Sequence, residues 1–264
     1  MITTKKHNVL KVKDLSIGYK SKKKVNIVTS NLNFKIESGT FVCILGKNGI
    51  GKSTLLRTLS KVQLPIEGEV VLNEKELSLY SNHELAQNLS LVLTEKLPES
   101  NLTVFELIAL GRQPYTNWIG KLTQNDLDII FKAIKLTNIE HLIDEKYYEL
   151  SDGQFQRVLI SRALAQDTNT IILDEPTAHL DIEHTLETFK LLKKLTIEEN
   201  KTIIVSTHEI QLAIQTADEL FLMTENKFIT GNPKTLIDNK SIDKLFSNDA
   251  IIFDRIKEQF ILKS

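Results

Sequence analysis

A glycine-rich segment early in the chain has the residue types of a phosphate-binding loop. The segment from 46 to 54 reads GKNGIGKST and fits the spacing G-x-x-x-x-G-K-[ST]. Glycine lets backbone N–H groups approach phosphate oxygens, Lys52 can reach the β- and γ-phosphates, and the Ser53 hydroxyl can join a Mg²⁺ shell. The spacing predicts a nucleoside triphosphate site contacted by Gly46, Lys47, Asn48, Gly49, Gly51, Lys52, Ser53 and Thr54.

Two adjacent carboxylates follow an apolar run much later in the chain. Residues 170 to 176 read TIILDEP, which places Asp174 and Glu175 at the end of an expected strand. Neighbours on a strand point in opposite directions, so the two carboxylates should have different roles. We expect Asp174 to hold Mg²⁺ and Glu175 to orient and deprotonate an attacking water. A pair of solvated carboxylates at a strand end is the alternative.

The elements around these residues indicate a parallel α/β core. Residues 41 to 45 (FVCIL) form a short apolar run, and the STLLRTLSK segment after the glycine-rich loop has helical spacing with Leu55, Leu56 and Leu59 facing inward. A second apolar run, TIIVSTH at 202 to 208, follows a helical stretch at 182 to 195. Alternating strands and helices predict a parallel sheet, which binds ligands at the carboxyl ends of its strands.

Three further regions surround that core. Residues 9 to 19 and 25 to 36 alternate apolar and polar positions around a solvated lysine tip at 22 to 24, and 68 to 73 should join them in an antiparallel sheet. From about 81 to 166 the pattern becomes mostly helical, with stretches at 102 to 110, 126 to 136 and 151 to 165. The tail contains turn signals and short amphipathic pieces. We expect one domain over 1–264, with a core and β subdomain at about 9–80 and 167–231, a Q-loop region and helical subdomain at about 81–166 and a tail at about 232–264.

Composition narrows the class of protein. The 264 residues are 41% apolar and 25% charged, which is ordinary for a globular chain. We find no run of 18 apolar residues and no signal-peptide core, so we expect a cytosolic chain whose membrane role, if it has one, is peripheral. The net charge of −1 argues against a nucleic-acid partner. The single cysteine, Cys43, should be a small buried residue.

The segment ELSDGQFQR at 149 to 157 separates the families that share a phosphate loop. Ser151 and Gln154 have the spacing of a capping box, so a capped helix alone would explain them. The LSDGQ sequence also resembles the signature LSGGQ of the ATP-binding subunits of ABC transporters at four of five positions. This resemblance implies that Ser151, Gly153 and Gln154 contact the γ-phosphate of ATP held by a second copy of the chain.

The same resemblance extends from Val9 to about Gly231 and assigns further residues. It implies that Tyr19 stacks on adenine, that Asp181 belongs to the D-loop between the two sites of a dimer, and that His208 bonds the γ-phosphate. Taken alone, Tyr19 would be an ordinary strand tyrosine and His208 a structural or solvated histidine. Four further histidines, His7, His83, His141 and His184, show no metal spacing and are interpreted as surface or packing residues.

The chain departs from the family pattern at three places. Thr94 stands where the family has the glutamine of its Q-loop, so a contact with Mg²⁺ would pass through water or through Glu95. Asp152 replaces the first signature glycine and should turn outward, because a carboxylate would repel a phosphate. The usual Ser-Ala pair before the D-loop leucine is Ala178-His179 here. An active ATPase is still expected.

Residues 102 to 130 carry a finer resemblance, to importers of iron–siderophore, haem and cobalamin, through the pattern V-x-E-L-x-x-x-G-R-x-P. Generic packing of Leu107, Ile108 and Leu110, followed by an arbitrary loop with Arg112, Pro114 and Tyr115, is the alternative.

The resemblance implies an ABC-type ATPase with ATP and Mg²⁺ as cofactors. It also implies a homodimer at the cytoplasmic face of the membrane, two permease subunits and, indirectly, an extracytoplasmic binding protein. A soluble ABC ATPase without a permease, such as a cofactor-assembly factor, is the main rival, and a phosphate-loop kinase would have no use for LSDGQ.

Overall fold

The computed structural model describes residues 6–21, 24–93, 100–117, 119–225, 227–246 and 250–263. Over these residues the strands form a six-stranded sheet, a four-stranded sheet and a two-stranded hairpin. Lys22, Lys23 and Thr94 lie outside the described residues, so the expected lysine tip and the expected Q-loop position are not seen. Lys24, directly before the next strand, is exposed.

The larger sheet has the parallel arrangement expected of the core. Its order is β10-β9-β3-β8-β7-β6, in which β9, β3, β8, β7 and β6 run parallel and β10 is antiparallel to β9. The bounds are β3 (Phe41–Gly46), β6 (Leu89–Val92), β7 (Thr170–Asp174), β8 (Thr202–Ser206), β9 (Glu219–Met223) and β10 (Phe228–Gly231).

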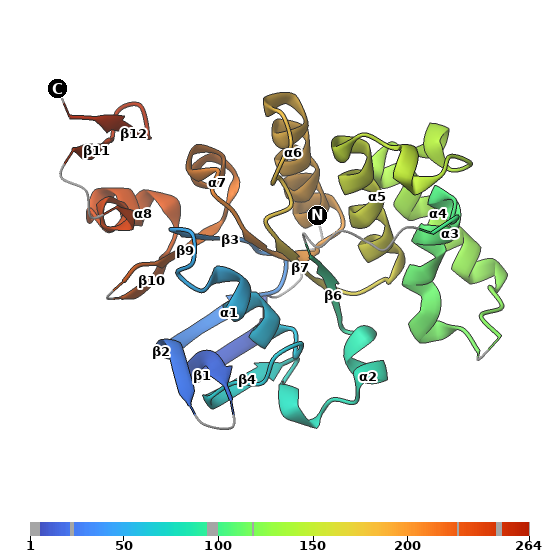
Figure 1. Cartoon of the computed structure of the whole chain (residues 1–264), viewed down its shortest axis with the longest axis horizontal. Coiled ribbons are helices and arrows are strands. Elements are labelled where there is room, and N and C mark those ends of the chain that lie inside the picture. The colour runs from blue at the N-terminus through green and yellow to red at the C-terminus, as the bar shows by residue number, and fades with distance from the viewer. Residues whose placement is uncertain are drawn as a thin grey trace.

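Strand β3 is buried on both faces, as its all-apolar sequence predicts. Phe41, Cys43 and Leu45 join the core beneath α6 and α7, whereas Val42 and Ile44 join the core shared with α1 and the smaller sheet. In Figure 1, α6 and α7 stand on one side of the larger sheet, and α1 with the smaller sheet lies on the other. Cys43 is fully buried, and burial raises the pKa of its thiol.

The smaller sheet confirms the expected antiparallel region. Its order is β2-β1-β4-β5, with every neighbouring pair antiparallel. The bounds are β1 (Asn8–Lys20), β2 (Val25–Glu37), β4 (Glu67–Leu72) and β5 (Lys75–Glu76). Leu15, Leu32 and Ile36 from this sheet pack with Leu55 and Leu59 of α1, so the sheet supports the helix that follows the phosphate loop.

The helices lie around these two sheets. They are α1 (Lys52–Leu59), α2 (Asn82–Ala86), α3 (Val104–Ala109), α4 (Gln124–Thr137), α5 (Asp152–Ala165), α6 (Ile182–Glu198), α7 (Ile210–Thr216) and α8 (Pro233–Asp238). Helices α3, α4 and α5 gather at one end of the molecule, and the C-terminal hairpin of β11 (Ile251–Asp254) and β12 (Gln259–Leu262) lies at the other (Figure 1).

Strand β6 is an element that the mostly helical pattern of residues 81 to 166 did not predict. This strand pairs with β7 at the edge of the larger sheet, so the stretch around it belongs to the core. The polar Ser90 interrupts its short apolar run, which hides the strand in the sequence. In the fold, Ser90 is fully buried, donates to the Ala163 carbonyl at 3.0 Å and lies 2.7 Å from the Thr168 hydroxyl.

Arg112 does not belong to an arbitrary loop. It lies in the 3₁₀ helix η2 (Leu110–Tyr115), is only 3% exposed, and donates from Nε to Asp126 at 2.9 Å and from Nη1 to the Ala165 carbonyl at 2.9 Å. Its guanidinium carbon lies 4.0 Å from the centre of the Tyr115 ring. This buried cation therefore joins the start of α4 to the end of α5.

We expect Asp126→Asn to destabilise the fold by about 3–5 kcal/mol at pH 7, because it leaves the buried Arg112 guanidinium without a counter-charge. Burial pushes the pKa of Asp126 upward, but hydrogen bonds from Thr123 and Arg112 outweigh it and hold the pKa below its usual range. The stabilisation is therefore present above the unfolded pKa of about 3.9 and lost as the pH falls through the folded pKa.

Denaturant unfolding of both proteins between about pH 3 and pH 7 measures this difference. Glu198→Gln, which removes an exposed pair with Lys194, is the control and should change stability by less than about 1 kcal/mol. A difference between Asp126→Asn and the unmodified protein that is the same across the whole pH range would contradict the assignment.

Candidate active site

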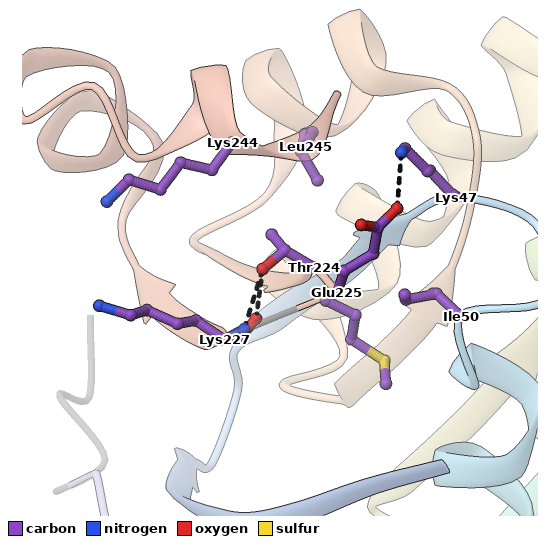
Figure 2. Close-up of a pocket in the computed structure, with 8 residues that line it drawn as sticks. Lys47, Ile50, Thr224, Glu225, Lys227, Lys244 and Leu245 are labelled. Carbon is purple, nitrogen blue, oxygen red and sulfur yellow. Dashed lines mark hydrogen bonds and ion pairs between the residues drawn. The ribbon is translucent and has the colours of Figure 1, made fainter. Parts of the chain in front are cut away.

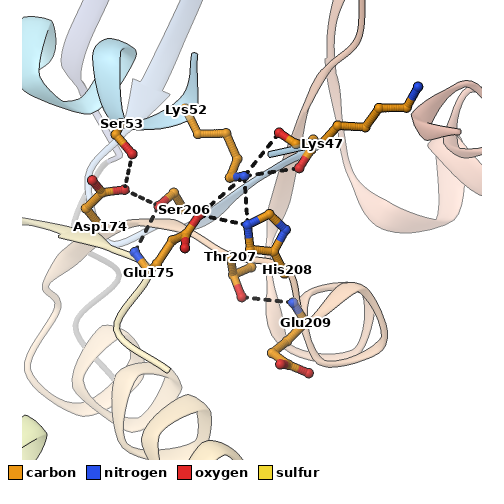
Figure 3. A network of polar contacts seen from close by, with 10 residues as sticks. Lys47, Lys52, Ser53, Asp174, Glu175, Ser206, Thr207, His208 and Glu209 are labelled. Atoms are coloured by element: carbon orange, nitrogen blue, oxygen red, sulfur yellow. Dashed lines mark hydrogen bonds and ion pairs between the residues drawn. The ribbon is translucent and has the colours of Figure 1, made fainter. Parts of the chain in front are cut away.

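The carboxyl ends of β3, β7 and β8 bring together the residues that the sequence spreads over more than half of the chain. Strand β3 leads into the phosphate loop, β7 ends at Asp174, and β8 ends at Ser206, two residues before His208. Figure 3 shows their side chains converging on one polar network. This is the edge of a parallel sheet at which ligands bind.

Lys52 is the centre of this network. Its side chain is 4% exposed, and its Nζ donates to the carbonyls of Gly46 at 3.1 Å and Lys47 at 3.4 Å. The same Nζ lies 3.0 Å from Nε2 of His208 and 3.4 Å from Oε1 of Glu175. Burial lowers the pKa of Lys52, and the charge of Glu175 opposes that shift. The Lys52 ammonium is thus surrounded by two carbonyl oxygens, a histidine nitrogen and a carboxylate oxygen.

Asp174 and Glu175 have different partners, although only Asp174 lies on β7, and Glu175 follows the strand with φ +46°. Asp174 is 4% exposed and accepts hydrogen bonds from Ser53 Oγ at 3.1 Å and from Ser206 Oγ at 2.6 Å. Glu175 is more exposed, and its Oε1 lies 2.8 Å from Nε2 of His208. The alternative of a pair of solvated carboxylates is wrong, because both side chains have specific partners in the site.

Ser206 is a site residue that the motifs did not single out. Its hydroxyl donates to Asp174 and accepts from the backbone N–H of Glu175 at 2.9 Å, so it orients both carboxylate residues. It is fully buried at the end of β8. The available signal was a polar residue that ends an otherwise apolar strand just before His208.

The phosphate loop requires glycine at two of its positions. Gly51 has φ +111°, which places it in the left-handed region that side chains disfavour. A Cβ at Gly46 would lie 2.6 Å from the Met223 carbonyl oxygen, so only glycine fits beside β9. Helix α1 begins at Lys52, directly after Gly51, and its free N–H groups and positive end can face an anion.

The side chain of Lys47 turns away from this network. Its Nζ pairs with Glu225 at 3.0 Å, beside a pocket of about 200 Å³ that Lys227 and Lys244 also line (Figure 2). Both side chains of the ion pair are well exposed. The contribution of Lys47 to the phosphate loop therefore comes from its backbone.

Tyr19, near the end of β1, lies against the first turn of α1. Its hydroxyl is 2.9 Å from Oγ1 of Thr54, whereas the residue as a whole is 52% exposed. An exposed ring held by one hydrogen bond beside the phosphate loop is well placed to stack on a base.

The LSDGQ segment forms the capped helix start that its sequence predicts. Ser151 Oγ accepts from the Gln154 backbone N–H at 3.3 Å, and Gln154 Oε1 accepts from the Ser151 N–H at 2.9 Å. Asp152 is exposed, as expected. Asp181 caps α6 by accepting a hydrogen bond from the His184 backbone N–H. Within the described residues, no hydrogen bond joins Ser151, Gly153 or Gln154 to the network around Lys52.

The residues present fit a magnesium ion held jointly with phosphates. The described part of the chain contains no cluster of three or more histidine, cysteine or acidic side chains that could form a protein-only metal site. The adjacent hydroxyl of Ser53 and carboxylate of Asp174 are instead the oxygen ligands that Mg²⁺ takes together with substrate phosphates. Thr94 is among the residues that the structure does not describe.

Fold and site together define a nucleotide hydrolase of the phosphate-loop class. A family model described as ABC transporter matches residues 29–178. The chain is 37% identical to an uncharacterized ABC transporter ATP-binding protein of Methanocaldococcus jannaschii, over 97% of this chain and 87% of that protein. It is 35% identical to the ferric enterobactin transport ATP-binding protein of Escherichia coli, over 93% and 89% of the two chains.

Solved structures agree with these relatives. An inward-facing metal-chelate type ABC transporter superposes with a TM-score of 0.79 at 26% identity, covering 97% of this chain and 96% of that one. A cassette solved as a dimer bound to ADP and phosphate superposes with a TM-score of 0.73 at 28% identity, covering 85% and 98%.

The chain therefore belongs to the ABC transporter family, as an ATP-binding subunit that hydrolyses ATP. Within the described parts of the chain, no helix has both the length and the apolar character that a transmembrane span requires.

Proposed function

We propose that this chain is the ATPase of an importer that takes up a metal chelate, such as an iron–siderophore, haem or cobalamin, through two partner permease subunits. The observation that carries the ATPase assignment is the contact of Lys52 with both Glu175 and His208. The similarity to transport proteins for ferric enterobactin and petrobactin supports the cargo class. The chain would work at the cytoplasmic face of the membrane, and an extracytoplasmic binding protein would deliver the cargo.

The described contacts suggest how ATP would engage this half of the site. Phosphate oxygens would replace the carbonyl oxygens as partners of Lys52, since an anion–ammonium hydrogen bond is stronger than a neutral one, and their negative charge would repel the Glu175 carboxylate from the same ammonium. Glu175, released from Lys52, would then take the proton of the attacking water on its carboxylate. His208 would turn Nε2 from Lys52 and Glu175 towards the γ-phosphate.

Ser53 and Asp174 would hold Mg²⁺, with Ser206 fixing the carboxylate of Asp174. When bound, the ion neutralises charge on the β- and γ-phosphate oxygens. The Thr94 contribution proposed from the sequence would come through water or Glu95.

A second copy of the chain would complete the site. The start of α5 presents Ser151, Gly153 and Gln154 at a helix N-terminus, where N–H groups and the helix dipole favour a phosphate. Asp181 would lie at the junction of the two sites. ATP would bind the closed dimer more tightly than the open one, and this difference in affinity would drive the permeases.

Reconstitution tests the importer assignment. The chain is purified together with a candidate permease pair, placed in vesicles with a binding protein, and assayed for ATP-dependent uptake of a ferric siderophore, haem or cobalamin. Uptake of one of these chelates, together with stimulation of ATP hydrolysis, is the expected result. An ATPase that neither copurifies with a permease nor responds to one would instead support the soluble assembly-factor alternative.

We expect Tyr19→Ala to weaken ATP binding about 5- to 100-fold, because stacking of a base on an aromatic ring contributes ~1–3 kcal/mol. Binding of inorganic triphosphate should not change, since it has no base. Tyr19→Phe is the matched control, which keeps the ring and removes only the hydroxyl that meets Thr54. Isothermal titration with both ligands measures the effect, and an unchanged ATP affinity in Tyr19→Ala would remove this residue from the site.

A further inference from the structure

A histidine outside all of the motifs connects two segments that face the proposed partner subunit. We call residues 150–154 the signature segment and residues 178–181 the D-loop. His184, in the first turn of α6, lies between them. Its side chain is 33% exposed, so it is neither free in solvent nor part of the apolar core.

One edge of the His184 ring is fixed to the D-loop. Oδ1 of Asp181 accepts from the His184 backbone N–H at 2.8 Å and lies 2.8 Å from Nδ1 of the same residue. These two hydrogen bonds lower the pKa of Asp181, so the carboxylate is the form that the contact favours. A helix cap needs only the backbone bond, and the ring bond is therefore an additional restraint.

The other edge of the ring packs against the signature segment. A Cβ added at Gly153 would lie 2.6 Å from Cγ and 2.9 Å from Nε2 of His184, so the ring occupies the space that any side chain at 153 would need. The φ angle of Gly153 is not positive, so the backbone conformation at this position does not require glycine. Farther along the same two helices, Arg157 of α5 forms an ion pair with Glu187 of α6.

We propose that His184 is a positioning residue that sets the distance between the D-loop and the signature segment of one subunit. This inference rests on the proposed two-subunit site, because both segments act there on ATP held by the partner. With Asp181 on one side of the ring and Gly153 on the other, the two segments move together when the dimer closes. Loss of the ring bond frees the D-loop to shift relative to the signature segment.

His184→Leu and His184→Asn test this role as a matched pair. Leucine and asparagine are similar in size, but only the asparagine amide can donate to Asp181 as Nδ1 does. A shift of about 1 Å in a site can reduce turnover by up to ~10²-fold. We therefore expect His184→Leu to lower kcat about 10-fold and His184→Asn to stay within about 3-fold of the unmodified chain. His141→Ala, an exposed histidine on another element, is the control.

The measurements separate positioning from simple destabilisation. The affinity of the monomeric chain for ATP should stay within about 2-fold in both variants, since the residues of that chain that contact its ATP are unchanged. The loss should therefore appear in kcat and not in ATP binding. Equal activity of the Leu and Asn variants would overturn the proposal. The two-subunit site itself would fail separately, if ATP produced no dimer of a Glu175→Gln chain with His184 intact.

Discussion

Glu175→Gln should lower the ATP turnover of this chain by about 10²–10⁴-fold, because a positioned general base contributes that much to a rate. Glutamine keeps the size of the side chain and can still contact His208, but it cannot take the proton of the attacking water. The phosphate-loop contacts through Lys52 and Ser53 do not depend on this carboxylate. ATP should therefore still bind, and the closed dimer should accumulate because it is no longer opened by hydrolysis.

Two assays check this result. Phosphate release gives the turnover, and light scattering with and without ATP gives the dimer. Glu225→Gln is the matched control, since Glu225 lies beside the same loop, pairs with the outward Lys47 and is exposed. It should hydrolyse ATP at nearly the normal rate. Near-normal hydrolysis by Glu175→Gln would remove this residue from catalysis, whereas loss in both variants would indicate general damage to the loop.

Lys52→Ala should weaken ATP binding about 10- to 100-fold, because a hydrogen bond to a charged group contributes about 1.5–3 kcal/mol. The native Lys52 ammonium is buried and held by two carbonyls, His208 and Glu175, so it is fixed near the place where the phosphates would bind. Its removal also leaves Glu175 nearer to the negative phosphates without a compensating charge. Both effects weaken ATP binding.

Lys47→Ala provides the comparison within the same loop. This substitution keeps the backbone of the loop and removes an outward ammonium, so ATP affinity should change by less than about 2-fold. Titration calorimetry of both variants with Mg²⁺ and ATP measures the difference, and thermal unfolding shows whether each is folded. If Lys47→Ala weakened ATP binding as much as Lys52→Ala does, the loss of affinity would reflect the net positive charge of the loop and not a specific contact.

Local patterns predicted much of this protein because they depend on neighbours in the chain. Glycine spacing gave the phosphate loop, the S-x-x-Q spacing gave the cap of α5, and all-apolar runs gave β3 and β7. Each of these signals lies within a few residues, where backbone geometry and hydrogen bonding are settled locally. The antiparallel pairing of β1 with β2 and β4 also followed from their alternating patterns.

Other features depended on contacts between distant segments and left weak signals. Strand β6 was missed, because Ser90 looks unfavourable in a buried strand until Ala163 and Thr168 satisfy its hydroxyl. The sequence left open whether Arg112 lies in an arbitrary loop, because Asp126, which makes its burial possible, is 14 residues away.

The sequence by itself determined the chemistry of this protein, since the residue types and their spacing at the phosphate loop, at Asp174-Glu175 and at LSDGQ specify an ATPase that resembles the ABC family. Only the tertiary structure decided which side chains act together. Lys52, Glu175 and His208 are far apart in sequence and meet because parallel strands place their carboxyl ends at one edge. Ser206 contacts Asp174 for the same physical reason: packing, and not chain order, brings the two side chains together.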